Sequence, residues 1–179
     1  MRSFNEKDVP PTPQCNCRDK PNCPLNGHCL AESIVYRADI TATGQEPKYY
    51  LGASSGKFKL RFGNHKKSLT HVRYKDDTAL SSHVWELRDK GADNITINWS
   101  IVRRVPTCKP GDKECRLCLA EKLAILPHSR DLHCLNKRTE LFSKCRHRRR
   151  NLLSSVATWT WTITAATPLL SYEIRLHTT

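Results

Sequence analysis

The sequence predicts an α+β fold in which a small three-stranded antiparallel sheet is flanked by helices. Residues 34–40 and 95–102 alternate apolar with polar side chains and are rich in β-branched residues, a pattern typical of strands. Residues 48–51 form a shorter strand of aromatic and aliphatic residues. Between the second and third strands, residues 57–65 and 78–89 carry apolar side chains at helical spacing. The predicted order is therefore strand, strand, helix, helix, strand.

The first two strands are expected to form a hairpin. Residues 43–47 contain a glycine and a proline and predict the turn between the strands. In such a hairpin Tyr36 and Tyr50 lie near each other on adjacent strands. After the second strand, Gly52 and Gly56 bracket two serines, so the chain is expected to turn sharply there. One of these serines is a candidate N-cap for the helix that follows.

The first helix is expected to present two different faces. Phe58 and Phe62 are four residues apart and would share a buried face. Arg61 and His65 are also four apart and would share the next face, which looks toward the strand that carries Tyr50. A phenol, a guanidinium and an imidazole would then converge. The alternative is an ordinary strand and an amphipathic helix with solvated charges.

Two further helices follow from the apolar pattern and from helix-ending residues. Leu80, Val84 and Leu87 give residues 78–89 one apolar face, and Lys90-Gly91 ends that helix. Residues 115–126 begin with a Cys-x-x-Cys motif and continue as an apolar helix that Pro127 terminates.

Length and composition favour one domain with appendages. The chain has 179 residues, of which 38% are hydrophobic, which is enough for one core. We divide it into a leader (1–14), a cysteine-rich segment that is a possible zinc knuckle (15–30), the main domain (31–153) and a tail of unknown role (154–179). We expect no membrane association and no secretory signal, because the sequence shows no long apolar stretch and no apolar N-terminal segment.

The charge balance points to a polyanionic partner. The net charge of +13 favours nucleic acid, although it is also compatible with a merely soluble basic protein. The basic run over residues 144–150 could hold phosphates or serve as a nuclear address. The residues expected to bind nucleic acid are Lys57, Lys59, Lys66, Lys67, Arg146, Arg148, Arg149 and Arg150.

The nine cysteines fall into two clusters and are more typical of metal ligands than of disulfides in a chain without a secretory signal. In the first cluster, the set Cys15, Cys17, Cys23 and Cys29 lies among prolines and glycines with little apolar content. A metal could organise such a segment, and zinc held by Cys15 or Cys17 together with Cys23 and Cys29 is our leading interpretation. The spacing is not a standard zinc pattern, and a loop of free thiols is the alternative.

The second cluster predicts a structural zinc site. Cys115 and Cys118 supply half of it, and Cys145 with His147 is a plausible other half, with His133 or Cys134 as substitutes. This zinc would pin the helix over residues 115–126 to the basic segment. A redox Cys-x-x-Cys is the alternative, but the βαβ context that such a motif needs is missing.

Several short motifs resemble the GIY-YIG nuclease superfamily. Ile34-Val35-Tyr36 stands where that family has Gly-Ile-Tyr, with Ile34 in place of the glycine, and Tyr50-Leu51-Gly52 stands where it has Tyr-Ile-Gly. Arg61 and His65 match the arginine and histidine of the family's first helix. The remaining matches are the metal-binding glutamate at Glu121 and the asparagine that closes the site at Asn136.

The chain is still more similar to the endonuclease domain of Penelope-like retroelements, from about Cys15 to Leu153. The strings that carry this likeness are Asn22–Gly27, Thr78–Ser81, Val84–Leu87, Cys115–Leu123, Leu135–Arg138 and Lys144–His147. The tail lies outside it. The resemblance implies a nuclear enzyme whose partners are DNA and the reverse transcriptase domain of the same element.

The resemblance implies a metal-dependent endonuclease that hydrolyses phosphodiester bonds in DNA. It would nick target DNA for retroelement integration, so that the reverse transcriptase primes from the broken strand. Tyr36 would be the general base, Arg61 would bind the phosphate, and Glu121 would bind one Mg²⁺ or Mn²⁺ ion. A phenol ionises near pH 10, so Arg61 and the metal would have to favour the anion.

The resemblance also implies supporting roles for other residues, and each role has an alternative interpretation. Tyr50 and His65 would orient the water or phosphate, and Asn136 would hold the site together. Each tyrosine could instead be an ordinary strand residue, Glu121 could be an exposed helix charge, and Glu86 is a rival metal ligand. The alternative function is a non-catalytic, zinc-containing module that binds RNA or DNA.

Overall fold

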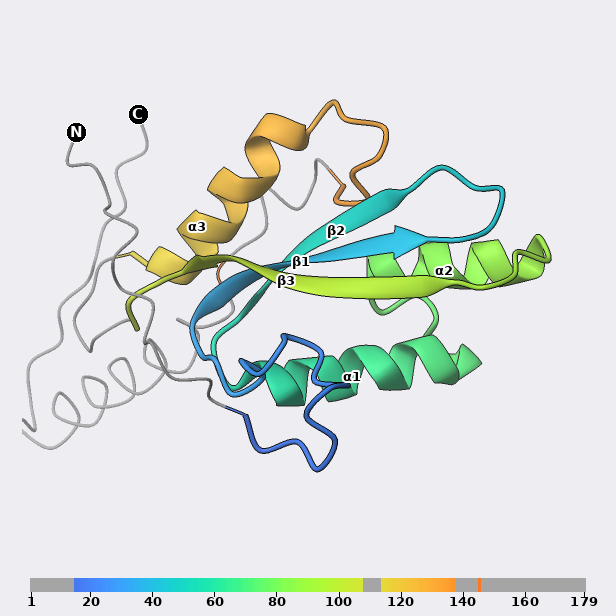
Figure 1. Cartoon of the computed structure of the whole chain (residues 1–179). Helices are drawn as coiled ribbons and strands as arrows, with labels where there is room; N and C mark the ends of the chain where they lie inside the picture. The colour runs from blue at the N-terminus through green and yellow to red at the C-terminus, as the bar shows by residue number, and fades with distance from the viewer. Residues whose placement is uncertain (1–14, 108–113, 138–144, 146–179) are drawn as a thin grey trace, which may run out of the picture. The chain divides into compact units, whose positions relative to one another are not determined.

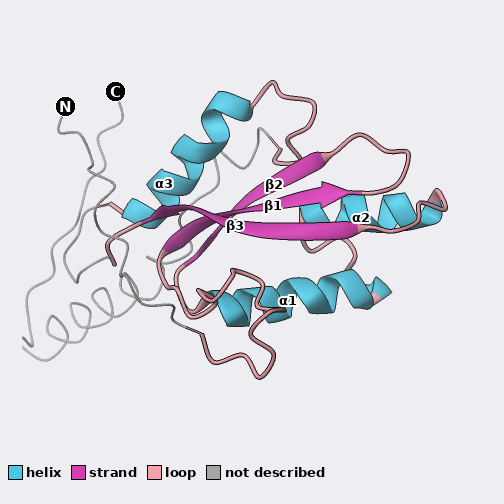
Figure 2. Ribbon diagram, in the orientation of Figure 1, coloured by secondary structure: helices cyan, strands magenta, loops and turns pink. Residues whose placement is uncertain are grey.

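The computed structural model of the chain describes residues 15–107, 114–137 and 145 (Figure 1). The chain divides into two compact units, Met1–Ser143 and Lys144–Thr179, and the fold given below is that of the first unit. Its sheet carries helices on both faces (Figure 2). The predicted α+β class with a three-stranded antiparallel sheet is confirmed. None of the helices among the described residues is long and apolar enough to cross a lipid bilayer.

The sheet has the order β2-β1-β3, and its strands are β1 (Ile34–Thr41), β2 (Lys48–Ser54) and β3 (Thr96–Arg104). The central strand β1 is antiparallel to both neighbours. The hairpin register pairs Tyr36 with Gly52 and Ala38 with Tyr50, so the two tyrosines lie two residue pairs apart on the same face of the hairpin. The chain bends at Ser55 and Gly56, inside the stretch where a turn was expected, but Gly52 itself continues the ladder and β2 ends only at Ser54.

An irregularity in the sheet lies beside Tyr36. The register between β1 and β3 shifts there, since Val35 pairs with Arg103 whereas Tyr36 pairs with Ile101. Val102 is thereby the extra residue of a β-bulge. Bulges bend a strand locally and re-aim its side chains, and they are frequent next to functional sites.

The two faces of the sheet bury different sets of residues. Alternate residues of β1 carry the main core, and this face packs against α1 (Phe58–Thr70), α2 (Ala79–Asp89) and Trp99 of β3. On the opposite face, Val35 packs against α3 (Arg116–Ile125). The main-core residues of β1 are Ile34, Tyr36, Ala38 and Ile40. The alternation in the sequence thus places β1 between two helical layers.

Helix α1 begins without the serine cap that we expected. Ser54 donates its hydroxyl to the carbonyl of Gly56, and the N-cap residue Lys57 makes no side-chain capping bond. Instead, the amide of Phe58 donates to the carbonyl of Ala31 at 2.9 Å. Amides of the first turn of α1 are therefore satisfied by the backbone carbonyls of Cys29 and Ala31, at the end of the cysteine-rich segment and just after it, rather than by a serine.

Helices α2 and α3 end close to the predicted residues. Thr78 caps α2 in a reciprocal capping box with Ser81, and Gly91, which follows the helix, adopts a φ of +72° that favours glycine. After α3 the chain tightens into the 3₁₀ helix η2 (Leu126–His128), which contains the predicted terminator Pro127. A second 3₁₀ turn, η1 (Val72–Tyr74), links α1 to α2.

The outer edge of β2 is covered by the segment that follows η2. The amide of Tyr49 donates to the carbonyl of His133 at 2.9 Å, and the amide of Leu135 donates to the carbonyl of Tyr49 at 2.8 Å. Tyr49 and Cys134 form an isolated parallel bridge. Residues 133–136 therefore extend the ladder for a few residues and protect an otherwise open edge.

Candidate functional site

Tyr36 lies at the centre of a buried polar cluster formed by β1 and α1. Its hydroxyl is 2.7 Å from Nε2 of His65, and Nε of Arg61 donates to it at 3.1 Å. The side chain has no exposed surface and packs against the rings of Phe58, Trp99 and His65. A phenol, a guanidinium and an imidazole do converge, but the phenol that hydrogen-bonds Arg61 and His65 is Tyr36 of β1 rather than Tyr50 of β2.

The direction of the two hydrogen bonds follows from the charge of His65. Burial, followed by the nearby Arg61 charge, lowers the pKa of His65 to about 3, so the imidazole is neutral at physiological pH. Arg61 can only donate, and the Tyr36 oxygen accepts that bond. The phenol therefore donates its proton to Nε2 of His65, which requires the neutral tautomer with its hydrogen on Nδ1.

The charge of Glu121, a residue of α3, also influences this cluster. Burial raises the pKa of Tyr36, the Arg61 charge lowers it, and the Glu121 charge raises it again. The Arg61 guanidinium likewise feels Tyr36, Tyr50 and Glu121, and these groups outweigh burial and raise its pKa. These mutual influences mean that side chains from β1, α1 and α3 share one electrostatic environment.

The open space that accommodates the Tyr36 hydroxyl is provided by Gly52. A Cβ atom at position 52 would lie 2.5 Å from the hydroxyl oxygen of Tyr36 and 2.9 Å from Cε1 of Tyr50. Only a residue without a side chain fits between the two phenols. The sequence motif contained this glycine, but we assigned it to a turn, and its packing role appears only in the folded hairpin.

Tyr50 and Asn136 occupy neighbouring positions with different functions. The Tyr50 ring is buried and lies 6.1 Å from the ring of His65. The Asn136 side chain accepts from the amide of Leu51 at 2.7 Å and donates to its carbonyl at 2.8 Å. Asn136 therefore ties the end of the 133–136 segment to β2 immediately beside Tyr50, while its expected role in closing an active site stays a prediction.

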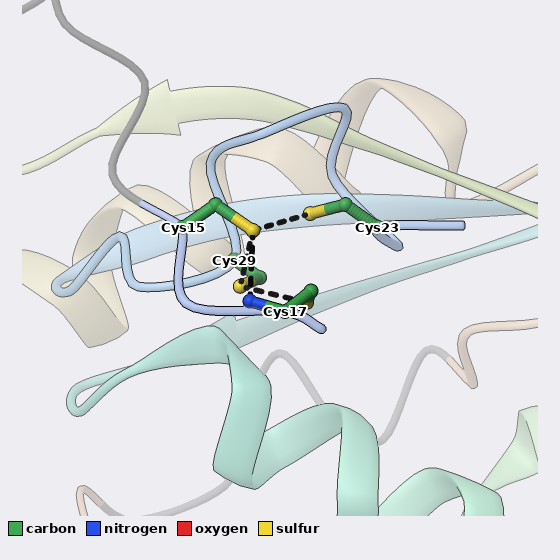
Figure 3. A group of neighbouring side chains, drawn as sticks. All are labelled: Cys15, Cys17, Cys23 and Cys29. Atoms are coloured by element: carbon green, nitrogen blue, oxygen red, sulfur yellow. Dashed lines mark hydrogen bonds between the residues drawn. The ribbon is translucent and has the colours of Figure 1, made fainter. Parts of the chain in front are cut away.

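The four N-terminal cysteines form one compact cluster (Figure 3). The sulfurs of Cys15 and Cys23 and those of Cys17 and Cys29 are each 3.5 Å apart, and Cys29 and Cys15 are 3.6 Å apart. All four sulfurs lie within 4.8 Å of one another. Such a set of soft ligands could hold a metal ion such as zinc. The structure brings Cys15 and Cys17 into the cluster together, where the sequence had left the choice between them open.

The thiols of this cluster differ in their electrostatics. Burial disfavours ionisation of Cys23, but the backbone amides of Leu25 and Gly27 donate to its sulfur and lower its pKa to about 7. Burial and the neighbouring Cys17 thiol raise the pKa of Cys29 to about 12 in the metal-free cluster. The Cys23 thiol therefore ionises at a lower pH than the Cys29 thiol, whose ionisation a bound cation would favour.

The second predicted zinc site is only partly covered by the described residues. Cys115 is the N-cap of α3 and Cys118 lies in its first turn, and both are half-buried. Cys145 belongs to the second compact unit, and His147 lies outside the described residues. Their joint coordination therefore remains a prediction. Of the suggested substitutes, His133 hydrogen-bonds the carbonyl of Pro47, and Cys134 pairs with β2.

The residues predicted to bind nucleic acid also lie partly inside and partly outside the described part of the chain. Lys57, Lys59, Lys66 and Lys67 are exposed on α1 or at its start, whereas Arg146 and the run 148–150 lie outside the described residues. Lys67 also stacks on the ring of Tyr74, with its ammonium 4.2 Å from the ring centre. The rival carboxylate Glu86 is exposed on α2 and lies 3.9 Å from the ring of His83.

Comparison of the chain with protein-family models, with curated proteins and with solved structures finds no match.

Proposed function

We propose that this chain is a metal-dependent endonuclease of the GIY-YIG type that hydrolyses phosphodiester bonds in DNA. The observation that carries the proposal is the hydrogen-bonded group of Tyr36, Arg61 and His65, on which the Glu121 charge acts. Its setting in nuclear DNA, where nicking would support retroelement integration beside a reverse transcriptase, rests on the resemblance to Penelope-like elements.

In this proposal Arg61 changes partners when the phosphate binds. The Tyr36 oxygen has no exposed surface and already has two hydrogen-bonding partners, so a water molecule needs one of them to move. The guanidinium of Arg61 is half-buried and would turn to a DNA phosphate, which it binds more strongly than a neutral phenol. That movement uncovers the phenol oxygen and places a positive charge on the scissile group.

Tyr36 would then accept the proton of the attacking water, and His65 would orient Tyr36. Nε2 of His65 orients the phenol, and the positive charges of Arg61 and of a cation at Glu121 would favour loss of the phenol proton to solvent, so that the Tyr36 oxygen can accept one from water. The attacking water oxygen forms its bond to phosphorus as the bond to the leaving oxygen breaks. Tyr50 packs beside His65 and keeps the imidazole in place.

In this proposal Glu121 is the carboxylate that would hold a single hard cation. Its carboxylate is half-buried and acts on both Tyr36 and Arg61, and carboxylate oxygen is the ligand type that Mg²⁺ and Mn²⁺ prefer. When bound, such an ion would neutralise the Glu121 charge and stabilise negative charge on the phosphate. Glu121 would therefore hold the ion, while Asn136 keeps β2 and its tyrosine in register.

A plasmid-nicking assay with Mg²⁺ or Mn²⁺, with EDTA as the blank, tests the proposal. We expect Tyr36→Phe, Arg61→Ala and Glu121→Gln each to reduce nicking by about 100-fold or more while duplex binding changes little. Tyr49→Phe and Glu86→Gln are matched controls, because they alter the same residue types outside the cluster. Equal nicking by Tyr36→Phe and Tyr49→Phe would refute the assignment.

The alternative is a non-catalytic module that binds RNA or DNA, which the net charge of +13 and the exposed lysines of α1 also favour. In that case no metal supports nicking by the wild-type chain. Binding would still weaken with salt, and Lys66→Gln would reduce the slope of log Kobs against log salt by about 0.9 for a lost phosphate contact. Nicking that needs metal and Glu121 excludes this alternative.

A further inference from the structure

The cysteine-rich segment carries four thiols and also caps the start of α1. The amide of Lys59 donates to the carbonyl of Cys29 at 2.7 Å, and that of Phe58 donates to the carbonyl of Ala31 at 2.9 Å. The Lys59 ammonium donates to Oδ1 of Asn16 at 2.8 Å. Two of the otherwise unpaired amides of the helix are therefore satisfied by carbonyls at the end of the loop that carries the cysteines.

The geometry of the cluster matches a tetrahedral zinc site. Four thiolates at about 2.3 Å from one Zn²⁺ ion would be about 3.8 Å from one another. Three of the sulfur separations are 3.5, 3.5 and 3.6 Å, and all are within 4.8 Å. A disulfide needs about 2.05 Å, so these sulfurs are unbonded. Cys23 and Cys29 are buried, while Cys15 and Cys17 close the outer side.

The backbone around the cluster is arranged for thiolate ligands. The amide of Cys17 donates to the sulfur of Cys15 at 3.3 Å, and amides of the turn after Cys23 point to that residue's sulfur. The turn includes Gly27 with a φ of 91°, a left-handed conformation that glycine adopts without strain. Amides that donate to sulfur stabilise the ionised form that binds metal.

We propose that Cys15, Cys17, Cys23 and Cys29 bind one Zn²⁺ ion, and that this ion holds the loop whose carbonyls cap α1, thereby positioning Arg61. Binding converts four thiols to thiolates and releases four protons to solvent, so the site carries a net charge of about −2. Leu25 anchors the loop in the main core, and the first turn of α1 places Phe58 against Tyr36. The metal site and the cap do not depend on the proposed nuclease function. Only an effect of zinc on cleavage, through the position of Arg61, rests on that function.

Zinc content of the purified full chain provides the first test. To remove the influence of the other cluster, the measurement uses a background with Cys115→Ser and Cys118→Ser. There we expect about one zinc per chain, and cobalt substitution should give the intense thiolate-to-cobalt absorption of a four-sulfur site. Adding Cys17→Ser should lower zinc affinity by at least about tenfold, whereas Cys17→His should restore it. Cys134→Ser, which removes a thiol outside the cluster, is the matched control.

Amide exchange in the zinc-loaded and chelated full chain tests the cap. Removal of zinc should accelerate exchange at least about tenfold at Phe58 and Lys59, with no comparable change in α2. No zinc in the background variant, disulfides in place of zinc, or equal zinc binding by Cys17→Ser and Cys134→Ser would overturn the metal site. Unchanged exchange in α1 after zinc loss would overturn the cap. Both readouts are independent of nicking, so a failed nuclease assay leaves them interpretable.

Discussion

At the scale of single residues, Gly52 determines whether the Tyr36 cluster can form. It pairs with Tyr36 across the hairpin, and the phenol fills the space in which a side chain at position 52 would lie. Gly63 differs from Gly52 in its surroundings. It is an exposed residue of α1, and a Cβ atom there would meet nothing within 4 Å. Two glycines of one short segment therefore have different physical reasons for their presence, and only one of them is required by packing.

Substituting alanine at each glycine separates these reasons. Gly52→Ala should destabilise the protein by about 1–3 kcal/mol, because its Cβ would force a fully buried tyrosine to shift. Gly63→Ala should stabilise it by about 0.5–1 kcal/mol, because alanine favours a helix interior. Urea unfolding curves measure both changes. Equal stability of the two variants would contradict the packing role of Gly52.

At the scale of elements, the 133–136 segment acts as a partial fourth strand without being one. Only Tyr49 and Cys134 form a bridge, and the side chain of Asn136 replaces the backbone partner for Leu51. A side-chain amide offers one acceptor and two donors, so it can satisfy both groups of a single residue. The edge of β2 next to Tyr50 is thereby fixed by a single side chain.

Asn136→Ala should therefore cost more than an ordinary surface change. It leaves the amide and carbonyl of Leu51 without their partner, and we expect a loss of about 2–4 kcal/mol in unfolding free energy. Leu132→Ala is the control, since Leu132 is 88% exposed and its replacement should change stability by no more than about 0.5 kcal/mol. Chemical denaturation and amide exchange at Leu51 measure the difference. Similar losses in both variants would contradict this interpretation.

At the scale of the whole fold of the first unit, one small sheet is covered by helices on both faces (Figure 2). Tyr36 and His65 of the polar cluster are buried within it. Burial of His65 affects the stability of the fold in acid. His65 has an ordinary pKa of 6.5, and burial together with Arg61 lowers it to about 3 in the folded chain. Between these values the unfolded chain binds a proton that the folded chain does not, so stability falls as the pH drops from 6.5 toward 3.

His65→Gln should remove this contribution. Below pH 6.5 the wild-type chain should lose up to about 1.4 kcal/mol of stability per pH unit more than the variant, because glutamine cannot take up the proton. Urea midpoints measured from pH 7.5 to 4.5 give the two slopes. His71→Gln, which alters an exposed histidine at the end of α1, should keep the wild-type slope. If His65→Gln also keeps it, the buried imidazole is not the acid-sensitive group.

Much of the fold could be read from local patterns. The alternation over 34–40 and 95–102 is set by which side chains are buried, and that pattern is present in the sequence itself. The second strand was predicted too short because Gly52 has a high turn tendency, yet cross-strand pairing overrides it. The serine cap failed for a similar reason, since carbonyls from residues 29 and 31 had already taken the amides of α1.

The sequence by itself determined the fold class, the basic charge and the residue types that carry the candidate chemistry, because periodicity and composition are local properties. Only the tertiary structure decided which groups meet. It brings Tyr36, Arg61 and His65 into direct hydrogen bonding, gathers four sulfurs into one cluster, and seats the cysteine loop on the first turn of α1. Such contacts join positions far apart in the chain, and they exist only once the sheet and helices have packed together.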